Sequence, residues 1–353
     1  MKRTILYIHL CILIFALLFS SCKPENNTTP QNLFTGVYIV NEGNFTWQNA
    51  SISFYDFQNR QVKPDIYSAA NESPLGDVAY SMTIINKKAY VVVNNSARIV
   101  VINPETAVKS GEITGFNSPR YLLRFSDSLA FVSDLYSPCI WIVNLHKGII
   151  SGKINLNKTA ENLLLSDNTL FAANWSKLST PLQNNNTVML INITDLTLFK
   201  EIEVGTEPNS MVLDKLNRVW VLCSGGFTGN ELPSLHCIDH ASQQIIKSFV
   251  FPTRIPLPSK LCINSTADTL YYLYGDIYKM AIESPILPVN PFIEQNSRLF
   301  YGLSINPGNN DIYVSDALDY TQRGTIFRYS ALGEAIDSFK AGINPGNFCF
   351  KGF

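Results

Sequence analysis

The side chains of this chain that could do chemistry are aromatic rings and amides, and they stand in the stretches between strand-like runs. Trp47, Trp175 and Tyr320 offer flat apolar surfaces, whereas Asn and Asp residues follow several of the runs. Such groups stack on a ligand and hydrogen-bond to it without reacting with it. The candidate ligand-binding residues are Asn41, Trp47, Asn94, Asn95, Arg120, Tyr136, Trp175, Phe227, Asp316, Tyr320 and Arg323.

These candidates also have a structural interpretation. An Asn or Asp at the end of a strand often satisfies the backbone of its own turn. This alternative stays open for the repeated set of Asn41, Asn94, Asp134, Asn174 and Asp316. The loop aromatics can pack within their own loops, and Arg120 and Arg323 can be solvated. The sequence therefore indicates where a site lies better than it indicates which residues bind.

Catalytic chemistry finds little support in the sequence. Three histidines follow the first 22 residues, and none stands beside a repeated carboxylate; for His236, in a strand-like run, we expect a satisfied polar role. The chain has no GxSxG, P-loop or GxGxxG motif. Asp214 is the exception among innermost strands that contribute almost no acidic residues, so a metal-lined pore is not expected. We expect a protein that is not an enzyme and has no cofactor or metal.

The composition excludes some classes of protein. The chain has 353 residues, of which 46% are hydrophobic, which is enough for a large core. Its formal net charge is −1 and charged residues make up 16%, so no basic field indicates nucleic acid as a partner. Aromatic residues reach 12%, and together with abundant Asn, Ser and Thr they favour β-structure.

A repeat of 40–50 residues organises the chain. Each unit opens with three mostly apolar residues, often shortly after a Pro, and continues with a β-branched and aromatic run such as "AYVVVN", a third run and a shorter fourth run. This period, built from short β-like runs, predicts a β-propeller with one four-stranded blade per repeat. The first apolar positions of the seven repeats are Met82, Leu122, Leu163, Met211, Leu261, Leu303 and Phe348.

The two ends of the repeat region complement each other. The run "VYIVN" at residues 37–41 resembles a second strand with no first strand before it. The chain ends shortly after "PGNFCF", which resembles a first strand with no second strand after it. We therefore predict that the C-terminal strand joins the N-terminal blade. This pairing closes an all-β, seven-bladed ring and leaves no open sheet edge.

The loops between second and third strands differ greatly in length. The connection at residues 274–276 is almost absent, whereas four others are long: residues 41–51, 174–186, 224–234 and 316–324. In a propeller these loops share one face with the connections between blades, to which Arg120 and Tyr121 belong. Tall walls beside a low one predict a concave, asymmetric face, where a ligand would sit.

The first 34 residues predict export and anchoring. Residues 1–21 combine a basic start with an apolar stretch too short to cross a membrane, which is typical of a signal peptide. Small residues directly before Cys22 resemble the bacterial lipobox, so we expect lipidation of Cys22, with ordinary secretory cleavage as the alternative. Residues 22–34 are polar and predict a lipid-anchored flexible tether, and residues 35–353 predict a single propeller domain.

Five cysteines remain after Cys22, an odd number without CxxC spacing. Each lies in an apolar run, so we expect buried, inert thiols. Cys223 and Cys237 are the one plausible disulfide, because they would lie on neighbouring strands.

Several motifs resemble those of a known family. "YVVVN", "FVSD" and "YVSDA" resemble the repeats of YncE/YVTN-like propellers. "NEGNF", "GDVAYSM", "TGFNSPRY" and "YVSDALDYTQRGTIFRYS" resemble motifs of the surface propeller lipoproteins of Bacteroidetes, the group that contains the BtuG cobalamin-binding proteins. The resemblance implies a seven-bladed propeller that is lipid-anchored at the outer membrane and exposed at the cell surface. It also implies that the protein binds cobalamin or a related corrinoid and passes it to a TonB-dependent transporter.

Other functions stay open at this point. A structural or adhesive surface protein would need a broad, flat face, and an enzyme would need carboxylates or histidines that converge at the pore. The long-loop face could also bind another nutrient or a protein. The asymmetry of the loops favours a ligand-binding protein over these alternatives.

The lipid anchor gives the first testable prediction. Cys22→Ser removes the thiol that would carry the lipid, and the rest of the chain has no other apolar segment of spanning length. We expect the variant to leave the membrane fraction and to become soluble after cell lysis, as judged by fractionation and immunoblotting. A variant that stays with the membrane in high salt would contradict the lipobox interpretation.

Overall fold

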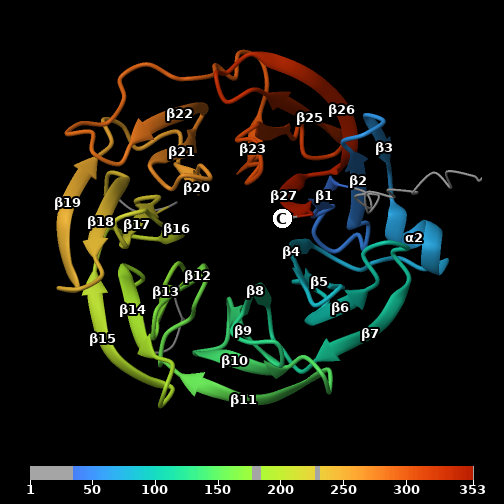
Figure 1. Ribbon diagram of the computed structural model, residues 1–353, viewed down its shortest axis with the longest axis horizontal. Coiled ribbons are helices and arrows are strands. Elements are labelled where there is room, and N and C mark those ends of the chain that lie inside the picture. The colour runs from blue at the N-terminus through green and yellow to red at the C-terminus, as the bar shows by residue number, and fades with distance from the viewer. Residues whose placement is uncertain (1–34, 177–183, 227–230, 353) are drawn as a thin grey trace, which may run out of the picture. The chain divides into compact units, whose positions relative to one another are not determined.

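The protein forms a ring of seven antiparallel β-sheets (Figure 1), as the computed structural model shows for the residues that it describes, 35–176, 184–226 and 231–352. The sheets stand around a common centre, with one edge strand of each sheet nearest to that centre. This arrangement confirms the all-β, seven-bladed propeller expected from the repeat.

The blades are named A to G in chain order, and the strands of each follow here from the centre outward. Blade A contains β27 (Pro345–Lys351), β1 (Gly36–Asn41), β2 (Ser51–Asp56) and β3 (Gln61–Lys63); blade B contains β4 (Ala79–Ile85), β5 (Lys88–Val93), β6 (Arg98–Ile102) and β7 (Lys109–Thr114). Blade C contains β8 (Pro119–Arg124), β9 (Leu129–Asp134), β10 (Cys139–Asn144) and β11 (Ile149–Asn155); blade D contains β12 (Leu163–Ser166), β13 (Thr169–Ala173), β14 (Thr187–Asn192) and β15 (Thr197–Glu203). Blade E contains β16 (Pro208–Leu213), β17 (Arg218–Cys223), β18 (Ser234–Asp239) and β19 (Gln244–Val250). Blade F contains β20 (Ser259–Ile263), β21 (Thr269–Tyr274) and β22 (Asp276–Ala281); blade G contains β23 (Phe300–Ile305), β24 (Ile312–Asp316), β25 (Arg323–Tyr329) and β26 (Ala335–Ile343).

The C-terminal strand closes the ring. β27 pairs antiparallel with β1, with Phe348 opposite Ile39, so the last residues complete the blade that the first strand begins, as predicted. The rings of Phe348 and Phe350 lie 6.1 and 5.4 Å from the ring of Tyr313 in blade G. Cys349 faces the other way, into the cluster between blades A and B. The strand is therefore wedged between its two neighbouring blades.

The buried side chains of the described residues form seven clusters, one at each seam between neighbouring blades. Successive side chains of a strand point to opposite faces, so Trp220 of β17 packs toward blade F while Val221 packs toward blade D. Both faces of an inner strand are therefore buried, which explains the nearly continuous apolar runs of the second strands.

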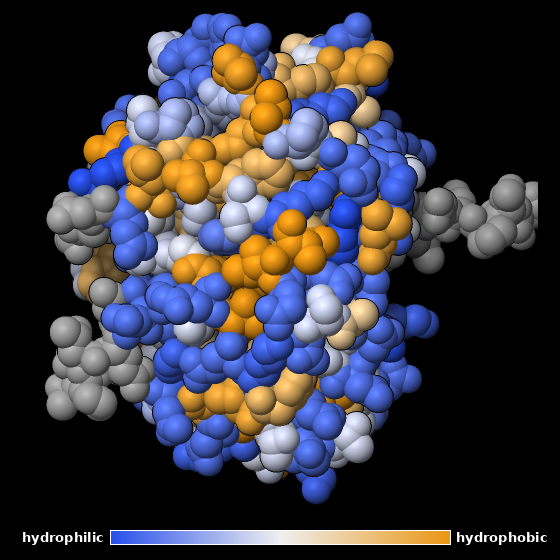
Figure 2. All heavy atoms as spheres, turned by 90° about the vertical axis from the view of Figure 1, so that its left-hand side faces the viewer, coloured by the Kyte–Doolittle hydropathy of each residue, from blue (hydrophilic) through white to orange (hydrophobic). Residues whose placement is uncertain are grey.

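The outermost strands alternate instead. In β19 and β15 exposed side chains alternate with partly buried or buried ones. One face of each strand packs against the interior of the protein, and the other face is exposed to solvent. Ile246 and Phe199 leave about half of their surface exposed on these strands, at 49% and 46%. Figure 2 shows this side of the ring, where apolar atoms form separate bands within a mainly hydrophilic surface.

Two local features depart from the repeat. A short helix, α2 (Ile66–Asn71), follows the three-residue strand β3, although the composition gave no signal for a helix. In blade F the segment after β22 adds no fourth strand in the described structure and meets it only through a bridge between Ile277 and Ile293. In the described part of the chain, no helix has the length and apolar character needed to cross a membrane.

The cysteines are all free thiols within the described residues. Cys223 and Cys237 do lie on the neighbouring strands β17 and β18, but Cys223 stands opposite Ser234 and Cys237 opposite Trp220. No disulfide joins them. Burial raises the pKa of both thiols to about 12, which keeps them protonated and inert.

Removal of the closing strand tests its role. Deletion of residues 346–353 removes the ladder with β1 and the contacts of Phe348 and Phe350. We expect a loss of several kcal/mol, a large part of the roughly 5–15 kcal/mol that stabilises a domain, together with aggregation through the exposed edge. Thermal unfolding and size-exclusion chromatography measure both effects.

A matched control deletes only residues 352–353 and keeps every residue of the ladder, which ends at Lys351. It should unfold at the temperature of the intact chain. If the longer deletion stays monomeric and equally heat-resistant, β27 does not stabilise the ring.

Candidate functional site

The centre of the long-loop face holds a cavity of about 860 Å³ to which all seven blades contribute. Nearly half of its lining residues come from one place in the repeat, the one or two positions before the first apolar residue. These residues are Tyr80, Arg120, Tyr121, Glu161, Asn162, Asn209, Ser210, Ser259, Lys260, Tyr301 and Asn347. The ring thus gathers seven equivalent positions around one space.

A backbone irregularity accompanies this position. In six of the seven blades, the pairing of the innermost strand with its neighbour shifts register near the cavity. In blade C the shift lies between Pro119 and Leu122 and so includes Arg120 and Tyr121. Such bulges re-aim side chains and are common next to functional sites. Here they accompany the side chains that line the cavity.

Among the described residues, each of the four long loops contributes one residue to the wall, namely Glu42, Trp175, Ser224 and Tyr320. The connection between blades E and F adds Leu257 and Pro258. The cavity therefore lies where the unequal loops predict a concave face.

The first polar cluster of the cavity joins blades B, C and D. The guanidinium of Arg120 donates two hydrogen bonds to the carboxylate of Glu161, at 2.7 and 2.8 Å, and the Tyr80 hydroxyl donates to the same carboxylate at 2.8 Å. The guanidinium lies 3.4 Å from the centroid of the Tyr80 ring and 5.6 Å from that of Trp175. Burial is the largest single influence and would lower the pKa of Arg120, but the charge of Glu161, its hydrogen bonds and the neighbouring tyrosines together outweigh burial, so the pKa lies above its ordinary value.

The second polar cluster joins blades A, F and G. The Tyr301 hydroxyl donates to Glu42 at 2.7 Å, and the Lys260 ammonium donates to the backbone oxygen of Gly346 at 2.8 Å. Burial raises the pKa of the Glu42 carboxyl and lowers that of the Lys260 ammonium, and the charge of each opposes the shift of the other. An ammonium has three donors, and the bond to Gly346 is the one that Lys260 makes among the described residues. Its remaining donors are available to a ligand.

Three sequence-derived candidates line the cavity, Arg120, Trp175 and Tyr320. Tyr320 keeps 45% of its surface exposed and meets the Tyr301 ring edge-on, with 5.8 Å between centroids. Two of the three residues are aromatic, and the third is a cation held against aromatic rings. The cavity therefore offers flat surfaces beside fixed charges.

Three other candidates are buried in the scaffold. Asn41 donates to Ser53 Oγ at 3.1 Å and accepts the backbone N–H of Gly342 at 2.9 Å. Asn94 donates to partners in the connection between blades B and C, and Asp316 accepts two backbone N–H groups near its own strand end. Their polar atoms are engaged by neighbouring strands and connections of the protein itself, which favours a structural role for these strand-end residues.

The remaining described candidates lie outside the cavity wall. Trp47 and Tyr136 are exposed, at 74% and 63% of their surface, and Asn95 donates to Asp77 at 2.5 Å. Arg323 forms an ion pair with Asp65, with nitrogen–oxygen distances of 2.9 and 3.1 Å.

The last two site residues predicted from the sequence are Phe227, expected to bind the ligand, and Cys22, expected to carry the lipid. Phe227 and Cys22 lie outside the described residues.

Sequence reasoning missed most of the charged groups of the cavity. Glu42, Glu161 and Glu207 all line it, although the innermost strands themselves carry almost no acid. These residues stand just after β1 or just before β12 and β16, so a count restricted to strands overlooks them. An alignment of the repeats that included the two preceding positions would have found Glu161, and also Lys260.

Residues 35–176, 184–226 and 231–352 contain no group of three or more His, Cys, Asp or Glu side chains arranged to hold a metal ion. His236 and His240 are four residues apart, but a ring nitrogen of His236 is 2.9 Å from Ser234 Oγ and one of His240 is 3.3 Å from the Ser166 carbonyl. His236 thus has the satisfied polar role expected of it.

Comparisons with known proteins agree with the fold. Residues 35–343 match the model of a protein family described as a domain of unknown function, DUF5074. Among curated proteins, none matches the chain.

Solved structures show the same architecture at low sequence identity. A quinonprotein alcohol dehydrogenase-like protein from Bacteroides thetaiotaomicron is 14% identical, with a TM-score of 0.68 over 90% of this chain and 78% of that one. A functionally unknown protein from Desulfotomaculum acetoxidans is 15% identical, with a TM-score of 0.64 over 89% of this chain and 98% of that one. These likenesses show the propeller fold alone and do not single out the YncE or BtuG group.

The buried ion pair of the cavity gives a prediction for stability. Glu161→Gln keeps the shape of the side chain but leaves the Arg120 charge buried without its counter-ion. We expect a loss of about 3–5 kcal/mol in urea unfolding, and partial recovery in the double variant Glu161→Gln/Arg120→Met. The control is Glu112→Gln, which breaks the exposed pair with Lys109 at 2.7 Å and should cost about 0–1 kcal/mol. Equal losses for both single variants would contradict this account.

Proposed function

The chain belongs to the DUF5074 family, and because that description assigns no function, we propose one from the cavity. The propeller is a binding protein for a large, rigid ligand that carries amide groups, and a corrinoid such as cobalamin matches the cavity best. The proposal rests on the composition of the cavity wall and on the resemblance of several sequence motifs to the cobalamin-binding group.

The observation that carries the proposal is a wall of aromatic rings and amides at the centre of a rigid ring. Ligand pockets typically combine apolar and aromatic lining with a few placed polar groups, in about 300–1,000 Å³. The aromatic residues of the wall are Tyr80, Tyr121, Trp175, Phe300, Tyr301 and Tyr320. The amides are Asn162, Asn209 and Asn347.

A corrinoid has the complementary chemistry. Its macrocycle is broad and apolar and is edged by amide side chains, and its nucleotide tail carries one phosphate. The macrocycle would stack on the aromatic wall. Its amides would use the donor and acceptor positions that Asn162, Asn209 and Asn347 retain beside their hydrogen bonds within the protein. Parts of the ligand that extend beyond the cavity would meet the exposed rings of the long-loop face, to which Trp47 and Tyr136 belong.

The phosphate would pair best with Lys260. Arg120 already forms an ion pair with Glu161, and Arg323 forms one with Asp65. Lys260 lines the cavity and keeps donors available. An incoming anion would also favour the charged form of this ammonium, against the burial that lowers its pKa.

A rigid site suits tight binding. Tyr80 and Tyr301 stand on strands and are fixed by hydrogen bonds across blades, to Glu161 and Glu42 respectively. Few side chains would then lose freedom when the ligand enters, and the ordering cost of about 0.5–1.5 kcal/mol for each mobile side chain would be small.

The cellular role that we propose follows from the first 34 residues. A lipid on Cys22 and a polar tether would hold the propeller at the outer membrane, exposed at the cell surface. There it would capture the corrinoid and pass it to a TonB-dependent transporter. A structural or adhesive role would call for a broad, flat face, which the central cavity does not favour.

Titration with cyanocobalamin tests the ligand. We expect it to quench tryptophan fluorescence, and we expect Trp175→Ala or Tyr320→Ala to weaken binding at least about tenfold, which corresponds to about 1.4 kcal/mol. The matched control is Phe199→Ala, an aromatic residue on the outer strand β15, which should bind with unchanged affinity. Calorimetry that detects no binding at micromolar concentration would refute the corrinoid assignment.

The same titration with cobinamide, which lacks the nucleotide and its phosphate, locates the anion contact. Lys260→Met should weaken cyanocobalamin binding much more than cobinamide binding. Equal losses for both ligands would show that Lys260 does not contact the phosphate.

A further inference from the structure

The short helix α2 creates a second hollow on the outer rim of the ring. In blade A the outer strand β3 ends after three residues, and α2 follows it. The helix lies outside β2 and beside blade B (Figure 1). Between the helix, the strands of blade A and the turn at residues 104–107 of blade B lies a pocket of about 400 Å³.

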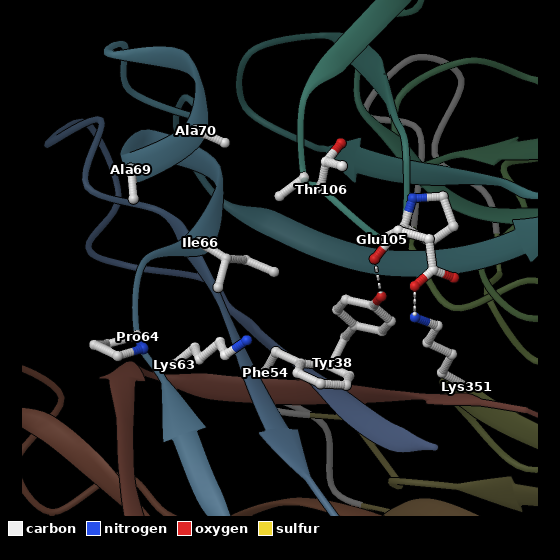
Figure 3. Close-up of a pocket in the computed structure, with 12 residues that line it drawn as sticks. Tyr38, Phe54, Lys63, Pro64, Ile66, Ala69, Ala70, Glu105, Thr106 and Lys351 are labelled. Carbon is white, nitrogen blue, oxygen red and sulfur yellow. Dashed lines mark hydrogen bonds and ion pairs between the residues drawn. The ribbon is translucent and has the colours of Figure 1, made fainter. Parts of the chain in front are cut away.

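Apolar groups form most of this rim pocket (Figure 3). Its floor contains the rings of Tyr38 and Phe54, whose centroids are 4.8 Å apart, and its sides contain Ile66, Ala69 and Ala107. Its volume falls within the range of small-molecule sites.

The walls of the rim pocket are fixed before any ligand enters. The Tyr38 hydroxyl donates to the Pro104 carbonyl and ties the floor to blade B. Asn71, at the end of α2, donates to the carbonyls of Tyr67 and Ala107 at 2.8 and 2.9 Å. At the other end of the helix, the N-cap residue Asp65 pairs with Arg323, which gives that arginine a scaffold role.

The charges at the rim pocket are unbalanced. Lys351 pairs with Glu105 at 2.6 Å, so these two charges offset each other. Lys63 also lines the pocket, and among the described residues it has no hydrogen-bond or ion-pair partner. Figure 3 shows its side chain running along the floor toward Phe54. One cation therefore stands unpaired beside an apolar hollow.

We propose that the rim pocket is a second binding site, for a small organic anion with an apolar body, such as an aromatic carboxylate. The body fills the hollow between Phe54 and α2, and the carboxylate pairs with Lys63. A neutral apolar molecule would lack the ion pair, and a cation would meet Lys63 with like charge. This site is independent of the proposed function of the central cavity.

The test uses 2-naphthoate as probe and 2-naphthamide as its neutral analogue, with binding followed by calorimetry and ligand-observed NMR on the full propeller. Naphthoate should bind the wild type several times more tightly than naphthamide. Lys63→Met should remove this difference and leave naphthamide binding unchanged. The control Lys153→Met, an exposed lysine on β11, should behave as the wild type.

A filled pocket gives the second arm. Ala69→Trp places an indole in the hollow from the exposed side of α2 and should weaken both probes at least about tenfold, whereas Ala241→Trp, in an exposed turn of blade E, should not. Unchanged melting temperatures confirm that both variants fold.

The proposal is overturned if naphthoate does not bind or if Ala69→Trp binds it normally. It is also overturned if Trp175→Ala abolishes binding, because the probe would then occupy the central cavity.

Discussion

The hydrogen-bond ladder between β27 and β1 is the constraint on which the other features of the structure depend. It turns a row of blades into a ring, and it also completes the cavity. The backbone oxygen of Gly346 accepts a hydrogen bond from the Lys260 ammonium, and the Asn347 side chain donates one to the Tyr80 carbonyl at 2.6 Å. A Cβ on Gly346 would stand 2.1 Å from the Glu42 carboxylate, so a side chain there would displace Glu42 from its place in the cavity wall. The strand that closes the ring therefore also completes the wall of the cavity.

The cavity holds charges that a purely structural core would avoid. Removing an ion pair from water costs free energy that the pair itself recovers only partly, so the buried contact of Arg120 with Glu161 is weak evidence for a gain in stability. The same contact fixes a guanidinium against Tyr80 and Trp175, which is useful to a binding site. The position of these charges, at the one space that all blades share, agrees with a role in recognition.

Both candidate sites arise where the repeat departs from its average. The side chains of the regular strands fill the seven seams between blades and are closely packed, so they are not available to a ligand. The long loops, the bulges of the innermost strands and the helix α2 are less constrained by packing between blades. The central cavity depends on the loops and bulges, and the rim pocket depends on a helix that follows a shortened outer strand. A repeat protein can in this way keep one scaffold and vary its sites.

The sequence by itself determined the number of blades, the closure by the last strand and the face that carries the cavity, because strand period, repeat spacing and loop length are local properties of the chain. It also placed Trp175 and Tyr320 in loops of that face. Only the tertiary structure decided which side chains meet. Glu42 and Tyr301 are 259 residues apart and share a hydrogen bond, and Asn41 is consumed by the ring closure through Gly342. Such partners are set by how blades pack around the centre, and no local pattern encodes that geometry.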